Sequence, residues 1–131
     1  MRASEVMIAD PIVVAAGATS SEVAALMRTK NISVVPVVDN PKDRRYLGTI
    51  SDRDVVTECV GLGHDPGDCS VQDHARTDTP VVKPETDLKG YKLAKPLDHH
   101  VRMTIVVVDG DMRVVGFIPH PEEIQGIVIG H

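Results

Sequence analysis

The sequence predicts a mixed α/β (α+β) fold in which one strand–helix–strand–strand–helix unit occurs twice. Three observations support this prediction. Short β-branched runs alternate with helix-start signals along the chain. Segments of the first half recur in the second half at a nearly constant offset. Aromatic residues make up only 2% of the chain, so aliphatic side chains must fill the core, and that composition favours strands.

The repeat is visible in three pairs of segments. Residues 10–14 recur as 78–82, residues 35–39 as 105–109, and residues 47–50 as 115–118. Pro11 and Pro80 are 69 positions apart, whereas Gly48 and Gly116 are 68 positions apart. The differences in length therefore fall between the elements and not inside them, as is usual for duplicated units.

The elements of the first copy can be predicted one by one. They are a short strand over residues 12–14, a helix opened by the capping box Thr19-Ser20-Ser21-Glu22, strands over 33–38 and 46–51 joined by a charged turn, and a helix from about Asp52 to Val60. The glycine-rich stretch that follows Val60 is expected to end this last helix.

The second copy repeats this order with a damaged first helix. Gly90 and Pro96 lie inside residues 88–101, and a proline removes a helix hydrogen bond, so a shortened or broken helix is expected there. Residues 70–73 between the copies predict a short capped turn. We predict one module over 1–131, with a first repeat over 1–63 and a second over 70–127.

Each copy leaves one sheet face apolar and is too small to be stable alone. We therefore expect the two units to pack sheet to sheet with pseudo-twofold symmetry, leaving a cleft along their interface for a small ligand.

Composition and charge exclude several classes of function. The net charge is −5 and is evenly spread, so no basic face is expected to bind nucleic acid. No apolar run approaches the ~18–20 residues that cross a bilayer, and the start of the chain lacks a signal peptide's apolar stretch. We therefore predict a cytoplasmic protein. Cys59 and Cys69 are expected to be reduced structural cysteines, with a disulfide between them as the less favoured alternative.

Motifs for catalysis or metal binding are not found in the sequence. Six histidines are present, but adjacent ones such as His99 and His100 point in different directions, and no CxxC or HxxxH spacing supplies a chelating pair. No GxSxG elbow, P-loop or paired-carboxylate motif occurs. We therefore predict that the chain is not an enzyme and holds no metal, with a bound zinc ion as the less favoured alternative.

The segments above resemble the CBS domain pair, or Bateman module, from about Ala3 to Ile127. The first copy carries the pattern as Val6-Met7, Asp10-Pro11-Ile12-Val13-Val14, Val35-Pro36-Val37-Val38-Asp39 and Gly48-Thr49-Ile50-Ser51-Asp52-Arg53-Asp54. The resemblance implies a free-standing regulatory module that requires no cofactor. It also implies a regulatory ligand between the repeats, of the class of AMP, ADP, ATP or S-adenosylmethionine.

The same resemblance implies a set of ligand-binding residues in the first copy. Asp54 would accept hydrogen bonds from a ribose diol, and Ser51 with helix-start N–H groups would take phosphate oxygens. The other expected contacts are Arg53 as a cation, Ile12 through its backbone beside the base, and Val34 with Pro36 as an apolar wall. Helix capping alone is the alternative explanation for Ser51 and Asp54.

The second copy departs from the family pattern. Pro119 stands where a serine or threonine is expected, and Glu122 where an aspartate is expected. Because Pro119 has neither a hydroxyl nor an N–H, at most one competent site is predicted, with Glu122 as a weaker candidate for ribose. The second strands also lack a basic residue for phosphate, since Val34 and Thr104 hold the aligned positions.

These arguments predict a homodimer, formed through exposed helices, that senses an adenosine-containing ligand and passes its state to an unknown protein partner. The alternative is a stress-response or scaffold interaction protein whose sites have decayed and which binds no nucleotide. Neither nucleic acid nor a membrane is an expected partner.

Overall fold

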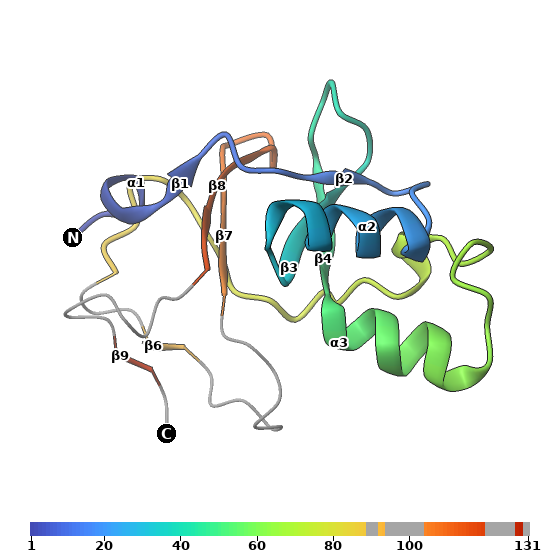
Figure 1. The fold of residues 1–131 in the computed structure, drawn as a ribbon. Coiled ribbons are helices and arrows are strands. Elements are labelled where there is room, and N and C mark those ends of the chain that lie inside the picture. Colours follow the sequence, from blue (N-terminus) through green and yellow to red (C-terminus); the bar gives the residue numbers. More distant parts are fainter. Residues whose placement is uncertain (89–91, 94–103, 120–127, 130–131) are drawn as a thin grey trace. The chain divides into compact units, whose positions relative to one another are not determined.

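The structure is a computed structural model that describes residues 1–88, 92–93, 104–119 and 128–129 of the 131-residue chain. The chain forms two compact units, one over Ile12–Asp78 and one over Met1–Pro11 with Thr79–His131 (Figure 1). Within the described ranges, no helix is both long enough and apolar enough to span a membrane.

The unit Ile12–Asp78 contains a three-stranded sheet in the order β2-β3-β4. β2 pairs parallel with β3, and β3 pairs antiparallel with β4. The elements of this unit are β2 (Val14–Ala15), α2 (Ser20–Lys30), β3 (Val34–Val38), β4 (Tyr46–Ser51), α3 (Asp52–Asp54), the π turn η1 (Val55–Cys59), and the 3-10 turns η2 (Val60–Leu62) and η3 (Val71–Asp73). The predicted strands over 33–38 and 46–51 are confirmed, whereas the first strand begins at Val14 and not at Ile12.

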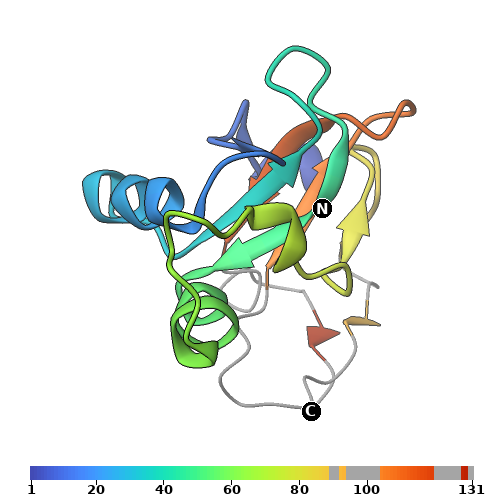
Figure 2. The same ribbon diagram turned by 90° about the vertical axis from the view of Figure 1, so that its right-hand side faces the viewer.

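Helix α2 starts at the predicted capping box. The Glu22 N–H donates to Thr19 Oγ1 over 3.1 Å, and the Thr19 N–H donates back to Glu22 Oε1 over 3.3 Å. The helix ends where Asn31 takes a left-handed conformation with φ of 55°. Figure 2 shows α2 and the helical turns after β4 on the same side of the β2-β3-β4 sheet.

The core of this unit lies between the sheet and these helices. It consists of Val14, Val23, Met27, Val35, Val37, Ile50, Val55 and Val71. Val35 and Val37 of β3 and Ile50 of β4 face this core. Because side chains alternate along a strand, the residues next to them on each strand face the other way. Val34 and Pro36 of β3 therefore share the opposite sheet face with Ser51 of β4.

The other unit repeats this topology. β5 pairs parallel with β7, β7 pairs antiparallel with β8, and β1 adds a strand at the edge of β8. Its elements are α1 (Ala3–Val6), β1 (Ile8–Ala9), β5 (Val81–Val82), β6 (Lys92–Leu93), β7 (Ile105–Val108), β8 (Val114–Ile118) and β9 (Val128–Ile129). The register shift between Val37 and Val38 recurs between Val107 and Val108. The internal repeat and the mixed α+β fold are thus confirmed.

A short segment in front of each copy pairs with the last strand of the other copy. Ile8 pairs with Phe117 on β8, and Arg76 forms an antiparallel bridge to Thr49 on β4. A glycine makes room in each case, since a Cβ on Gly48 would lie 2.5 Å from the Arg76 carbonyl oxygen and a Cβ on Gly116 would overlap the Met7 side chain.

The structure differs from the sequence-based predictions for residues 70–73 and for part of the second copy. Residues 70–73 form the 3-10 turn η3 (Val71–Asp73), but Ser70 does not cap it and donates its Oγ proton to the Ala16 carbonyl over 2.9 Å. Lys92–Leu93, inside the range predicted as a broken helix, form strand β6 paired with β9. The rest of that helix and the last helix of the second copy lie outside the described residues. Sheet-to-sheet packing stays a prediction.

Candidate functional site

The end of β4 runs directly into a helix that is capped by its own side chains. Ser51 takes the extended N-cap conformation, with φ of −113° and ψ of 166°. The Asp54 N–H donates to Ser51 Oγ over 3.2 Å, and the Ser51 N–H donates to Asp54 Oδ2 over 2.9 Å. The capping role of Ser51 and Asp54 is therefore confirmed, and it fixes the position of the Asp54 carboxylate.

Arg76 forms an ion pair with the second oxygen of this carboxylate. Its Nε donates to Asp54 Oδ1 over 2.8 Å, and the side chains are 35% exposed for Arg76 and 2% exposed for Asp54. A buried carboxylate needs such a partner, because an unpaired charge is costly to remove from water. The hydrogen bond to Asp54 in turn raises the pKa of the Arg76 guanidinium above its ordinary value.

Sequence reasoning missed Arg76. Its backbone is fixed by two hydrogen bonds to Thr49, one from the Thr49 N–H over 2.9 Å and one to the Thr49 carbonyl over 2.7 Å. The repeat contains a signal that would have found it. Arg76 precedes Asp78 by two positions, as Ile8 precedes Asp10, so the two residues are equivalent edge residues of the two copies.

The structure brings four of the predicted ligand-binding residues together. Val34 is the cross-strand partner of Ser51, and Pro36 is the partner of Thr49, so these side chains stand on one face of the β3–β4 pair. Val34 is half-buried and Pro36 is buried. Ser51 ends this face with a hydroxyl, and Asp54 in the helical turn that follows adds a carboxylate and, through Arg76, a guanidinium.

The remaining predicted residues are placed differently. The Arg53 side chain is exposed, and the Arg53 backbone N–H donates to Asp52 Oδ1 over 2.8 Å. Ile12 precedes β2 and is 42% exposed. Glu122 lies outside the described residues.

The two cysteines and a histidine form a second cluster in the same unit. Cys59 and Cys69 are buried and are not joined by a disulfide, and their sulfur atoms lie 2.7 Å apart. The hydrogen bond from Cys59 is the main cause that raises the pKa of Cys69 from 9.0 to about 11. Together with His74, these residues are a group that can hold a metal ion.

Comparison with known proteins identifies the fold and the domain. The family model of the CBS domain matches residues 3–61. No curated protein sequence gives a significant match to the chain.

Three solved structures illustrate the similarity in fold. A putative acetoin utilization protein, AcuB, from Vibrio cholerae has 25% identity and a TM-score of 0.70, covering 91% of this chain and 84% of that one. Hypoxic Response Protein I, solved with two coordinated zinc ions, has 23% identity and a TM-score of 0.72, covering 91% and 92%. The CBS domain protein PAE2072 from Pyrobaculum aerophilum, solved in complex with AMP, has 21% identity and a TM-score of 0.70, covering 91% and 87%.

The matched domain over residues 3–61, the repeated strand topology and the shared fold agree with one another. Residues 3–61 therefore carry a CBS domain, and the fold of the chain is similar to that of CBS-domain proteins.

Proposed function

We propose that this chain is a regulatory module that binds an adenosine-containing small molecule, of the class of AMP, ADP, ATP or S-adenosylmethionine. The observation that carries the proposal is the Asp54–Arg76 pair, in which a buried carboxylate and a partly exposed guanidinium lie 2.8 Å apart at the start of a helix. A carboxylate is suited to a sugar diol, and a guanidinium is suited to a phosphate.

Arg76 supplies the cation that β3 lacks. A guanidinium carries five N–H donors, and the contact with Asp54 uses the one on Nε, so the donors on the two terminal nitrogens are available to phosphate oxygens. The Ser51 hydroxyl lies next to the same carboxylate and is proposed to add a further contact. The base would lie against Val34 and Pro36, because an apolar wall with a few fixed polar groups is the usual form of a small-molecule site.

Asp54 is proposed to change partner when the ligand enters. Its two oxygens already accept hydrogen bonds from the Ser51 N–H and from Arg76. A ribose diol would replace Arg76 at Oδ1, while the phosphate of the same ligand takes the released guanidinium. The exchange moves the Arg76 side chain while its backbone stays bonded to Thr49. A ligand shifts such an equilibrium only by its difference in affinity between the two arrangements.

The ligand class is supported by the AMP found in the similar fold of PAE2072. One observation favours the rival function, a nucleotide-free stress-response or scaffold protein. In the structure, the helix cap and the ion pair already satisfy both oxygens of Asp54, so the carboxylate does not need a ligand. Ligand titration separates these two functions.

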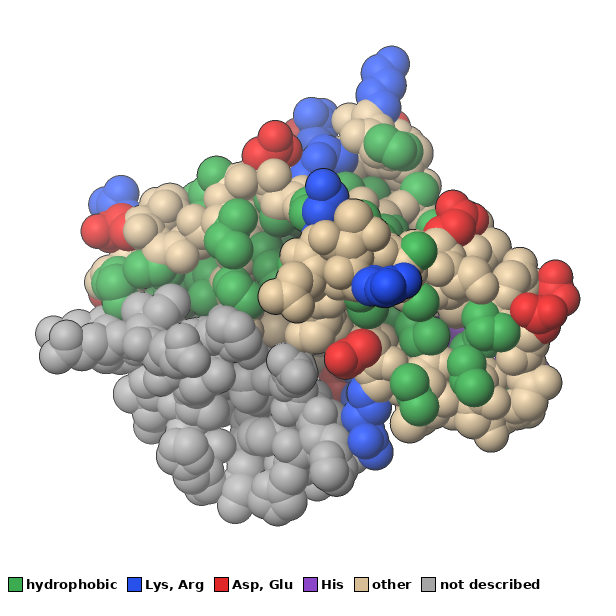
Figure 3. Space-filling view, viewed as in Figure 1, with side chains coloured by type: hydrophobic (Ala, Val, Ile, Leu, Met, Phe, Trp, Pro, Cys, Tyr) green, Lys and Arg blue, Asp and Glu red, His purple; other side chains and the backbone are tan. Residues whose placement is uncertain are grey.

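The proposal extends to a homodimer in the cytoplasm that acts on a protein partner. Val56, Val60 and Leu62 are 60%, 51% and 62% exposed on the helical turns after Asp54. Figure 3 shows hydrophobic side chains gathered over this region. An exposed apolar patch of this kind is typical of a protein–protein contact.

Isothermal titration calorimetry tests the ligand. The chain is titrated with AMP, ADP, ATP, S-adenosylmethionine and adenosine, and Arg76→Ala is compared with Arg28→Ala, which removes an equal charge from the exposed side of α2. At least one adenosine compound is expected to bind. Arg76→Ala should weaken phosphate-bearing ligands by roughly 10–100-fold, the value of one charge-assisted hydrogen bond, and leave adenosine nearly unchanged.

The control Arg28→Ala should keep the affinity of the unmodified chain. Equal affinities for the Arg76 and Arg28 variants would remove Arg76 from the site. If none of the compounds binds at millimolar concentration, the scaffold function is correct. Sedimentation velocity on the same samples reports whether the chain is a dimer and whether the ligand changes its shape.

A further inference from the structure

Four residues with metal-binding side chains recur at intervals of five positions in the unit Ile12–Asp78. They are Cys59, His64, Cys69 and His74. The helical turns after Asp54 end at Gly63, which has a φ of 82°, and the His64 N–H then donates to the Cys59 carbonyl over 3.0 Å. The chain reverses at this point, so the loop that follows returns past the end of the helical segment.

Three donor atoms converge in this loop. The two Sγ atoms of Cys59 and Cys69 and a ring nitrogen of His74 all lie within 4.8 Å of one another. Cys59 is 0% exposed, Cys69 is 7% exposed, and His74 is half-buried. Two buried thiols and an imidazole, brought together from three separate turns of the chain, are the donor types found in structural zinc sites.

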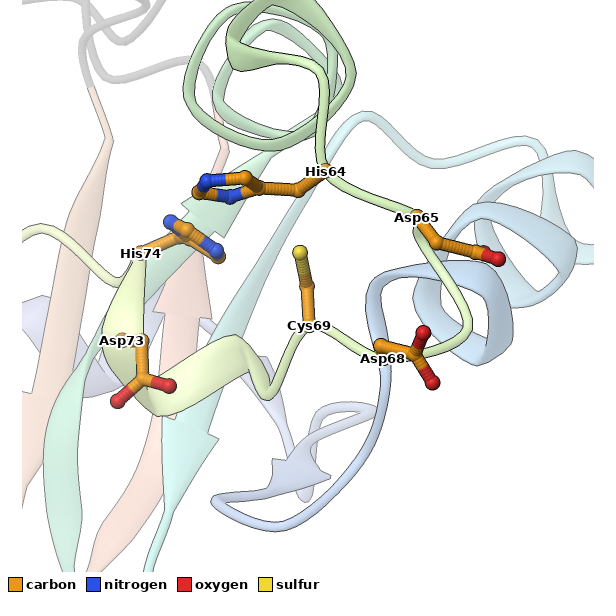
Figure 4. Close-up of a pocket in the computed structure, with 6 residues that line it drawn as sticks. All are labelled: His64, Asp65, Asp68, Cys69, Asp73 and His74. Atoms are coloured by element: carbon orange, nitrogen blue, oxygen red, sulfur yellow. The ribbon is translucent and has the colours of Figure 1, made fainter.

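His64 is placed to supply a fourth donor. Its ring centroid lies 6.2 Å from that of His74, and its side chain is exposed and can therefore rotate. Figure 4 shows the two imidazoles and the Cys69 sulfur turned toward the same space. The three residues line a cavity of about 370 Å³.

The charge around the cavity favours a cation. Its lining residues, all within the described range 64–74, include Asp65, Asp68 and Asp73 and no lysine or arginine. Figure 4 shows the carboxylates of Asp68 and Asp73 directed away from the sulfur. These two carboxylates are therefore not expected to coordinate the metal directly. Their negative charge nevertheless lowers the electrostatic energy of a divalent cation in the cavity.

We propose that Cys59, Cys69 and His74, completed by His64, bind one zinc ion. Thiolate sulfur with imidazole nitrogen is the donor set that selects zinc over magnesium or calcium, and four protein ligands make a closed structural site. Zn–S bonds of about 2.3 Å in a tetrahedron require sulfur atoms about 3.8 Å apart, so the 2.7 Å contact must widen by about 1 Å.

Protons balance in this step. In the metal-free chain, Cys59 shares its thiol proton with Cys69. Two thiols lose their protons to solvent when zinc binds, and both histidines bind as neutral imidazoles. No electron is transferred, so no oxidant or reductant is needed.

A disulfide between Cys59 and Cys69 is the competing fate of the two thiols. It would leave the convergence of His74 and the acidic lining without a role, whereas zinc uses both. The site also has a clear structural effect, since the loop from Cys59 to His74 connects the helical segment that begins at Asp52 with the segment that carries Arg76. Zinc is expected to fix this loop whether or not the ligand site is occupied.

Cobalt and zinc titrations of the reduced, chelator-treated chain test the site. Co²⁺ should bind with a stoichiometry of one per chain, giving a thiolate-to-cobalt charge-transfer band and intense visible bands typical of a tetrahedral site, and Zn²⁺ should displace it. Cys69→Ser should lower the charge-transfer intensity, because it removes one of the two thiolates. It should also weaken zinc binding by more than about 100-fold, because even outer partners of metal ligands are worth about 10–100-fold.

Two further variants keep the test valid if the cysteine variant folds poorly. His64→Ala changes an exposed side chain and should lower zinc affinity while keeping the charge-transfer band. Asp73→Asn is the matched control and should bind zinc almost as the unmodified chain does.

The proposal is overturned if the reduced chain does not bind zinc, or if Cys59→Ser and Cys69→Ser bind it unchanged through other histidines. Unchanged affinity in His64→Ala would overturn the four-ligand site. Thiols alkylated before cell lysis report the native state, and a chain that is isolated with Cys59 and Cys69 joined would assign the pair to a disulfide.

Discussion

The strands β2-β3-β4 and the corresponding strands β5-β7-β8 share their topology and even a register shift at the same place. Both hairpins are also closed by an equivalent aspartate. Asp39 Oδ1 accepts the Arg45 N–H over 2.9 Å, and Asp109 Oδ1 accepts the Arg113 N–H over 2.9 Å. Packing and turn geometry therefore constrain both copies alike.

The copies differ at the end of the last strand. In the first copy, Ser51 caps the following helix and Arg76 pairs with Asp54, whereas Pro119 and Ile8 hold the equivalent positions in the second. Pro119 offers neither a hydroxyl nor an N–H, so the cap cannot recur there. The comparison shows that a duplicated sheet can keep its core while one copy loses the polar groups beside it.

Equivalent core positions give the largest expected effect. Ile50 is 0% exposed in one hydrophobic cluster, and Ile118 is 1% exposed in the other. Ile50→Ala and Ile118→Ala should each lower the free energy of unfolding by about 2–5 kcal/mol, through lost burial and the cavity left behind. Urea denaturation followed by circular dichroism measures both. If only one variant lowers the free energy of unfolding, the two cores do not contribute equally to the stability of the fold.

The two glycines should give unequal effects. An added Cβ at Gly48 meets the Arg76 carbonyl, which the Thr49 hydrogen bonds hold in place, whereas at Gly116 it meets the flexible Met7 side chain. We expect Gly48→Ala to cost about 2–3 kcal/mol and Gly116→Ala about 1 kcal/mol, within the usual range for overpacking. Thermal and urea denaturation check the order. The reverse order would show that the Arg76 segment moves away easily.

The smallest effect concerns acid stability. Hydrogen bonds from backbone N–H groups, first that of Arg113, lower the pKa of Asp109 below its ordinary value of 3.8. The ionised form therefore stabilises the fold above the unfolded-state pKa, and this contribution is lost as the pH falls through the lower folded-state pKa. Asp109→Asn should flatten the decrease in Tm below about pH 4. An unaltered profile, measured by calorimetry from about pH 7 to pH 2, would contradict this assignment.

Local signals predicted much of the first copy. The capping box at Thr19, the strands over 33–38 and 46–51, and the end of the helical segment near Gly63 all depend on residues close together in the chain. The predicted first strand starts two residues before the observed one, because apolar residues at 12–14 do not show which of them will find a hydrogen-bonding partner on β3.

Contacts across longer separations were not predictable in the same way. Arg76 lies 22 positions from Asp54, and nothing local marks it as the partner of that carboxylate. The π turn over Val55–Cys59 changes which side of the helix Cys59 faces, so the meeting of Cys59, Cys69 and His74 does not follow from helical spacing. The sequence-based search for short chelating motifs therefore missed this cluster.

The sequence by itself determined the repeat, the order of strands in the first copy, the capped start of α3 and the weaker chemistry of the second copy, because each depends on neighbouring residues or on repetition. Only the tertiary structure decided that Arg76 neutralises Asp54 and that two cysteines meet a histidine. The physical reason is that a buried charge or thiol is partnered by whichever group the folded backbone brings within a few ångströms, and distance along the chain does not encode that choice.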